Sequence, residues 1–215
     1  MVSGTVAAVV GDHPVPGERS FAAATRLQQV LTLKRGSDLG VVLLSGGASS
    51  LIGAPLRGLA EDDLANLYRL VLHSGLDIAD MNAIRKRFSY WAAGRMALAL
   101  APARSYCFAI SDVPGDDLSV IGSGPCVPDP TRVQRVIDLL ADTGLDAAVP
   151  STFRQYLADT ARGAIPETPK ENHPAFAHMT AAVIGNGDGT DSSAANGRSI
   201  AQALPISPTT RKAKR

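Results

Sequence analysis

The sequence predicts an α/β protein with a mostly parallel sheet, arranged as a Rossmann-like three-layer sandwich. Short apolar runs of strand length alternate with stretches in which apolar residues recur at helical spacing. Most of these runs are followed by a turn rich in glycine, serine or aspartate, as after residues 41–44, 107–110 and 180–184. Parallel sheets are built from such strand–helix–strand units, and their functional sites collect at the carboxyl ends of the strands.

Four strands are predicted. They are residues 6–10, 41–44, 107–110 and 180–184. The second is apolar throughout, which is typical of a strand buried on both faces of a parallel sheet. Pro14 and Pro16 follow the first strand and prevent it from continuing.

Seven helices are predicted from apolar stripes of helical period. They are residues 18–33, 61–73, 78–87, 90–100, 132–140, 153–161 and 192–204. Gly36 and Gly75 stand where the first two of these helices end. Residues 163–174 contain three prolines and predict a loop.

Composition and charge exclude several classes of protein. The chain has 215 residues, 45% of them hydrophobic, which is enough for one packed domain. Four of the 21 basic residues lie in 211–215, and the rest of the chain has 17 basic against 20 acidic residues. A mildly acidic body argues against a nucleic-acid partner, and no apolar run is long enough for a membrane span. We assign residues 1–204 to an α/β domain and residues 205–215 to a disordered basic tail.

The cysteine content indicates the cellular compartment. Cys107 and Cys126 are the two in the chain, and they show no metal-ligand spacing. Few cysteines without a disulfide pattern predict a reducing, cytoplasmic compartment.

The turn at residues 45–50 is the first candidate for ligand binding. Its two glycines allow a close backbone approach, and its serines add hydrogen-bond donors that suit a phosphate. It is not a Walker A loop, because no Lys-Ser or Lys-Thr follows the glycines. A purely structural turn remains the alternative.

The turn at residues 111–117 brings Asp112, Asp116 and Asp117 together. Carboxylates this close repel one another unless a cation compensates, and Mg²⁺ takes one or two carboxylates. An Asp-rich turn with local backbone hydrogen bonds explains the pattern equally well.

Three polar residues, Asn82, Arg85 and Lys86, share one face of a predicted helix. Such a face can neutralise a phosphate or a carboxylate, although spacing alone favours a solvated basic face. The turn-rich segment 121–131 is either a shaped ligand wall or a rigid connector.

Six motifs occur in a fixed order. They are Gly-Asp-His-Pro-Val-Pro at 11–16, Leu-Ser-Gly-Gly-Ala-Ser-Ser-Leu at 44–51, Asn-Ala-Ile-Arg-Lys at 82–86, Ile-Ser-Asp-Val-Pro-Gly-Asp-Asp at 110–117, Ser-Gly-Pro-Cys-Val-Pro-Asp-Pro-Thr at 123–131 and Ile-Pro-Glu-Thr-Pro-Lys at 165–170. The series resembles the glycerate 2-kinase family, whose members carry a C-terminal MOFRL domain and are often labelled hydroxypyruvate reductase. The resemblance covers about residues 5–200.

This resemblance implies phosphorylation of D-glycerate to 2-phosphoglycerate by ATP, with Mg²⁺, in a cleft between a large α/β domain and a smaller one. By matching motif, the residues implied in cofactor binding are Ser45, Gly46, Gly47, Ala48, Ser49, Asn82, Ser123 and Gly124. Those implied in catalysis are Arg85, Lys86 and Asp112, and those implied in metal binding are Asp112 and Asp116.

The sequence also departs from the family pattern. Members begin earlier, with a Gly-Ala-Gly-Lys-Ala loop whose lysine is thought to be catalytic. The resemblance leads us to expect that this chain is without that loop and without the MOFRL domain. Arg87 and Cys126 stand where the family usually has histidine and threonine. We therefore expect a fold that is incomplete relative to the family and weak or absent kinase activity from this chain alone.

These departures leave two alternative functions open and predict that the chain associates with copies of itself. The first alternative is a non-catalytic fragment that binds nucleotide or is only a remnant. The second, a hydroxypyruvate reductase, is disfavoured because no Gly-x-Gly-x-x-Gly turn is present. Exposed apolar edges predict self-association into a homo-oligomer.

Overall fold

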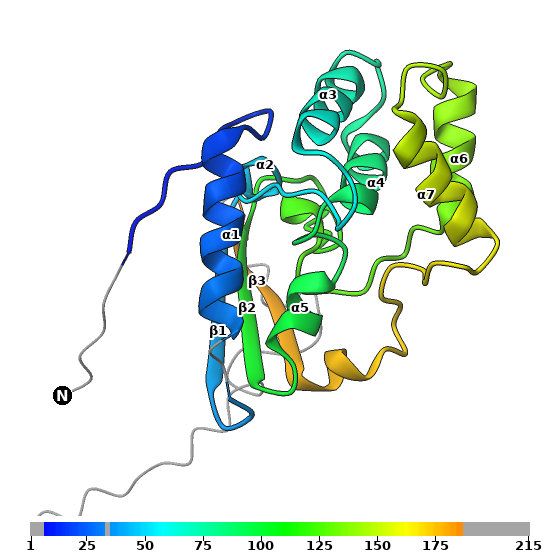
Figure 1. Cartoon of the computed structure of the whole chain (residues 1–215). Coiled ribbons are helices and arrows are strands. Elements are labelled where there is room, and N and C mark those ends of the chain that lie inside the picture. The colour runs from blue at the N-terminus through cyan, green and yellow to red at the C-terminus, as the bar shows by residue number, and fades with distance from the viewer. Residues whose placement is uncertain (1–6, 33–34, 187–215) are drawn as a thin grey trace, which may run out of the picture.

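Three parallel strands form the sheet of this computed structural model, which describes residues 7–32 and 35–186 (Figure 1). The strands are β1 (Leu39–Leu44), β2 (Arg104–Ser111) and β3 (Met179–Asn186), in the order β1-β2-β3. Val42 pairs with Cys107, which in turn pairs with Ala181. The predicted α/β class with a parallel sheet is confirmed, and these strands match three of the four predicted ones.

Helices α1 (Glu18–Thr32) and α5 (Arg95–Leu100) lie against one face of this sheet (Figure 1). Their apolar side chains pack with those of the strands into one core. Its buried members include Ala24, Leu44, Met96, Leu100, Cys107, Ala109 and Val183. The burial on both faces that the apolar run predicted for β1 is wrong. Leu39, Val41 and Leu43 face away from this core and are 64%, 56% and 77% accessible.

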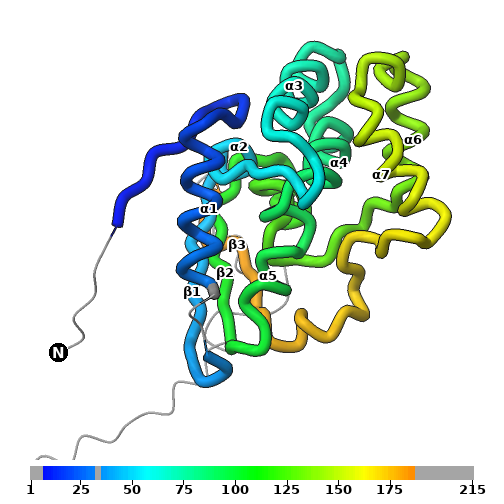
Figure 2. The backbone as a smooth tube through the Cα atoms, in the orientation of Figure 1, coloured from blue at the N-terminus to red at the C-terminus, as the bar shows by residue number. Residues whose placement is uncertain are grey.

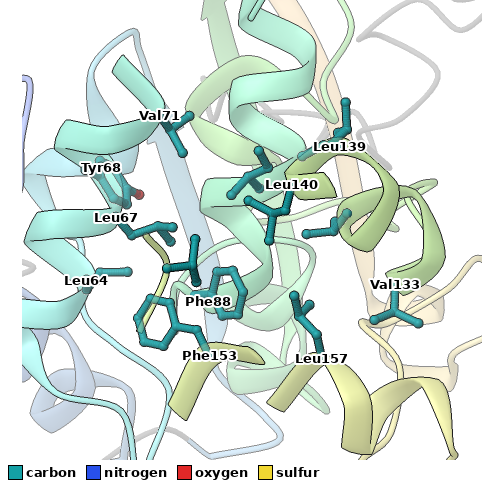
Figure 3. Packing of buried hydrophobic residues seen from close by; sticks show 14 of the residues in the cluster. Leu64, Leu67, Tyr68, Val71, Phe88, Val133, Leu139, Leu140, Phe153 and Leu157 are labelled. Carbon is teal, nitrogen blue, oxygen red and sulfur yellow. The ribbon is translucent and has the colours of Figure 1, made fainter. Parts of the chain in front are cut away.

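A second core lies among four helices beside the sheet (Figure 2). These are α3 (Glu61–Leu72), α4 (Ile78–Phe88), α6 (Val133–Asp142) and α7 (Ser151–Ala161). Figure 3 shows Phe88 of α4 next to Phe153 of α7, and the two rings stack with centroids 4.5 Å apart. Burial of these aromatic and aliphatic side chains fixes α4 between its neighbours.

Three short elements complete the described chain. They are α2 (Ala48–Leu51) and the 3₁₀ turns η1 (Ile121–Ser123) and η2 (Pro174–His178). After α7 the chain returns to β3 through a long irregular segment that contains the predicted loop at 163–174 (Figure 2). None of the helices in the described ranges is long and apolar enough to cross a membrane.

Two predicted elements differ in the structure. Residues 7–10 are not a strand: they are exposed and pair with no strand of the described sheet. The helix predicted at 90–100 begins only at Arg95, because Ala93 and Gly94 take the left-handed conformation. Their N–H groups donate to the carbonyls of Ser123 and Gly124 instead of to a helix.

The other predicted helices are confirmed within two or three residues at each end. The helix predicted at 192–204 and the basic tail at 205–215 lie outside the described residues.

Candidate active site

The carboxyl ends of β1 and β2 border a cavity of about 310 Å³. The turn after β1 lines it with Gly46 and Gly47, and the turn after β2 lines it with Asp112. Adjacent parallel strands end at the same edge of a sheet, so the two candidate loops share this cavity. The sequence-predicted residues on its wall are Gly46, Gly47, Ser49, Asn82, Arg85, Asp112 and Ser123.

The turn after β1 requires both of its glycines. A Cβ on Gly46 would overlap the carboxylate of Asp112, so this glycine lets the two loops touch. Gly47 has φ +82°, a left-handed conformation that favours glycine, and a Cβ there would lie 3.2 Å from Cδ2 of His13. α2 begins directly after this turn, which places Ser49 on the cavity wall.

Arg85 supplies a buried positive charge. Its side chain extends from α4 to the cavity, although Arg85 is only 7% exposed. Its Nε and Nη2 find no hydrogen-bond partner among the described residues. Burial lowers the pKa of Arg85, opposed by the nearby Tyr68, but arginine stays protonated in proteins. Such unpartnered donors are suited to an anionic ligand.

A chain of hydroxyl groups lies beside this arginine. Tyr68 Oη is 3.1 Å from Ser49 Oγ, which is 2.8 Å from Ser123 Oγ. Burial raises the pKa of Tyr68, so its hydroxyl is protonated at neutral pH. Ser123 has φ +64° between two left-handed glycines, Gly122 and Gly124. A non-glycine residue held in this conformation is typical of a functional site.

Asn82 joins the same wall from α4. Its Nδ2 donates to the carbonyl of Val120, 3.4 Å away, which ties α4 to η1. The side chain lies one helical turn before Arg85, as the spacing predicted.

The two candidate metal carboxylates border a smaller hollow next to the first cavity. Asp112, Asp116 and Asn186 all line it. Asn186 Nδ2 donates to Asp116 Oδ2 at 3.0 Å. In the described chain no three His, Cys, Asp or Glu side chains form a metal cluster. Two carboxylates are nevertheless the number that Mg²⁺ commonly takes from a protein, with water and phosphate completing its shell.

Lys86 is not brought to the cavity. Its Nζ lies 2.7 Å from Oδ1 of Asp129, and both side chains are at most 5% exposed. Burial alone would raise the pKa of Asp129, but Lys86 and hydrogen bonds from Thr168 and Thr131 hold it below its usual range. Ser45, Ala48 and Gly124 also lie off the wall of the larger cavity, and Asp116 lines only the smaller hollow.

Sequence reasoning missed Tyr68 and gave His13 no role. Tyr68 sits among the apolar residues of α3 that face the core and is fully buried. The signal was available, because a hydroxyl within an apolar stripe requires a polar partner. His13 lines the cavity from the turn before α1.

Fold and site together define an α/β protein with a cavity, lined in part by a buried arginine, at the carboxyl ends of parallel strands. Residues 3–158 match the family described as a domain of unknown function, DUF4147. The match covers most of the chain, and the chain belongs to this family.

Two proteins of similar sequence support this assignment. The chain is 35% identical over 162 residues to a glycerate 2-kinase of Pyrococcus horikoshii, covering 75% of this chain and 37% of that protein. It is 37% identical over 155 residues to an Agrobacterium vitis protein named as a hydroxypyruvate reductase, covering 72% of this chain and 35% of that one. The chain therefore spans little more than a third of either relative.

A solved structure gives the same picture. The crystal structure of a Thermotoga maritima glycerate kinase superposes with a TM-score of 0.69 at 31% identity. The superposition covers 82% of this chain and 39% of that one. The resemblance to glycerate 2-kinases is thus confirmed in sequence and in fold.

Proposed function

We propose that this chain carries phosphate- and acceptor-binding parts of a glycerate 2-kinase, which transfers the γ-phosphoryl group of ATP to D-glycerate and gives 2-phosphoglycerate. The observation that carries the proposal is the convergence of the Gly46–Gly47 turn, Asp112 and Arg85 on one cavity. The glycerate kinase names of the relatives support it.

The residues divide by chemistry into two groups. The glycine turn and the hydroxyls of Ser49 and Ser123 suit phosphate oxygens, since they offer close approach and neutral donors. Asp112 lines the same cavity and would orient the acceptor hydroxyl and take up its proton as the new O–P bond forms and ADP leaves. Arg85 and Asn82 lie on the α4 side of the same cavity and suit the acid.

The donor set fits Mg²⁺. Asp112 and Asp116 would hold it on the edge of the smaller hollow, where they lie with the amide of Asn186. When bound, the ion would neutralise negative charge on the phosphates. Asp112 faces both hollows and would connect the cation with the acceptor.

A coupled assay with ATP, Mg²⁺ and D-glycerate tests the proposal. We expect slow turnover, and we expect Asp112→Asn to reduce it by roughly 10²- to 10⁴-fold. Asp117→Asn is the matched control, because Asp117 lies on the same turn but caps the N–H of Ser119 and lines neither hollow. Equal activity in the two variants would contradict the role of Asp112.

A binding measurement separates the alternatives. A rise in melting temperature with ATP but no turnover would favour a non-catalytic nucleotide-binding protein. NADH oxidation with hydroxypyruvate would favour a reductase. We expect no oxidation of NADH.

We also propose that the protein acts in the cytoplasm, because the thiols of Cys107 and Cys126 are free.

A further inference from the structure

Arg85 has donors that the described protein does not use. A buried polar group without a hydrogen-bond partner is energetically costly, and a charged one more so. Both Nε and Nη2 are in this state, although the residue is more than nine-tenths buried and lines the cavity. A ligand with two oxygen acceptors would satisfy both donors at once, as in fork-to-fork pairing.

Tyr68 fixes where this guanidinium lies. The Cζ atom of Arg85 sits 5.0 Å from the centroid of the Tyr68 ring, within the range of a cation–π contact. The ring is fully buried in α3. Its hydroxyl donates to the carbonyl of Ser49 at 3.2 Å and lies near Ser49 Oγ. The tyrosine is therefore held by burial of its ring and by Ser49 at its hydroxyl, and it gives the arginine a rigid flat support.

We propose that Tyr68 is a positioning residue that holds the Arg85 guanidinium ready for an oxyanion with two oxygens, a carboxylate or a phosphoryl group. The cavity then selects ligands by this charge before any chemistry occurs. The inference rests on the proposed function only for the identity of the acceptor acid.

The geometry favours selection by charge and shape together. No acidic side chain within hydrogen-bond distance of Nε or Nη2 competes for them in the described residues. Asn82, one turn away on α4, is neutral and already donates to Val120. An anion reaching this wall therefore meets an uncompensated charge in a partly desolvated place, where pairing is stronger than in water.

Calorimetric titration of the folded chain with three ligands tests the proposal. The ligands are D-glycerate, inorganic phosphate and D-glyceramide, which has the shape of the acid without its charge. We expect an anion to bind at least about tenfold more tightly than the amide. If D-glycerate binds more tightly than phosphate, the site takes the carboxylate; the reverse order assigns it to the phosphoryl group.

Three variants isolate the role of the tyrosine. Tyr68→Phe keeps the ring face and should leave the ratio of amide to anion dissociation constants within about twofold. Tyr68→Met fills the space without a ring face and should reduce that ratio about fivefold. Arg85→Gln should abolish the preference. The melting temperature of each variant is measured first to establish that it folds. The Arg85→Gln variant still tests the preference for the anion if Tyr68→Met does not fold.

A purely structural tyrosine would weaken both ligands equally and leave the ratio unchanged in Tyr68→Met. That result, an unchanged preference in Arg85→Gln, or equal binding of amide and anion by the unaltered chain would each overturn the proposal. Failure of the proposed function is visible separately, because it appears as lost turnover in the coupled assay while anion binding persists.

Discussion

Gly46 illustrates how a single missing side chain shapes the cavity. The carboxylate of Asp112 occupies the space where a Cβ of residue 46 would lie. Glycine at this position therefore lets the turn after β1 and the turn after β2 approach this closely. The close approach brings the phosphate-type turn and the candidate catalytic carboxylate together.

We predict that Gly46→Ala displaces Asp112 and reduces kinase turnover about as much as Asp112→Asn, while the chain stays folded. The reason is steric, because the added methyl group and the carboxylate cannot share one place. Gly185→Ala is the control, since no atom lies within 4 Å of a Cβ at that position. Full activity in Gly46→Ala would show that Asp112 has freedom to move.

The ion pair of Lys86 and Asp129 leads to a stability prediction. Removing one partner of a buried pair leaves a buried charge unmatched, which costs about 3–5 kcal/mol. We expect Asp129→Asn to lower the free energy of unfolding by about this amount, as measured by denaturant titration. Asp138→Asn, at an exposed position of α6, should change it by less than about 0.5 kcal/mol.

Two carboxylates with basic partners, Asp129 beside Lys86 and Glu167 beside Arg87, predict acid sensitivity. The pKa values of Asp129 and Glu167 are lower in the folded chain than their usual values. Carboxylates of this kind stabilise the fold fully above their unfolded pKa, near 4, and lose that contribution as pH falls through the folded value. Unfolding free energy should therefore decline below about pH 4, and less steeply in Asp129→Asn. An identical slope in both proteins would contradict the assignment.

At the scale of elements, α4 shows what the sequence could and could not predict. The helix, its bounds and the joint placement of Asn82 and Arg85 follow from periodicity. The direction of Lys86 does not, because neighbouring residues differ by about 100° around a helix and Asp129 is far along the chain.

The end of α4 depends on equally distant contacts. Arg95 is half-buried, and its guanidinium donates to the carbonyls of Lys86, Arg87 and Ser89, 2.9–3.1 Å away. These bonds satisfy acceptors that the helix itself leaves free. The left-handed residues just before Arg95 bond to the segment at 123–124, so the shortened helix could not be predicted from local alanine content.

The strands, unlike the end of α4, could mostly be predicted from the local sequence. Three predicted strands are confirmed because a continuous apolar run in a parallel sheet is a local signal. Residues 7–10 carry a similar run, and yet Val9 and Val10 are 51% and 64% exposed. An apolar run becomes a strand only where another strand pairs with it, and pairing is a property of the whole sheet.

At the scale of the whole molecule, the outer side of β1 is an exposed apolar surface. Leu39, Val41 and Leu43 project from an edge strand of the described sheet. Edge strands with exposed apolar side chains favour association between chains.

We predict that the purified chain forms a homo-oligomer whose mass rises with concentration. The double variant Val41→Lys, Leu43→Lys should shift it towards the monomer, because lysines on an edge strand oppose pairing. Leu72→Lys, at an exposed position of α3, should leave the mass unchanged. Light scattering after gel filtration measures the mass of the unaltered chain and of both variants. A constant monomer mass in the unaltered chain would mean that this surface does not associate.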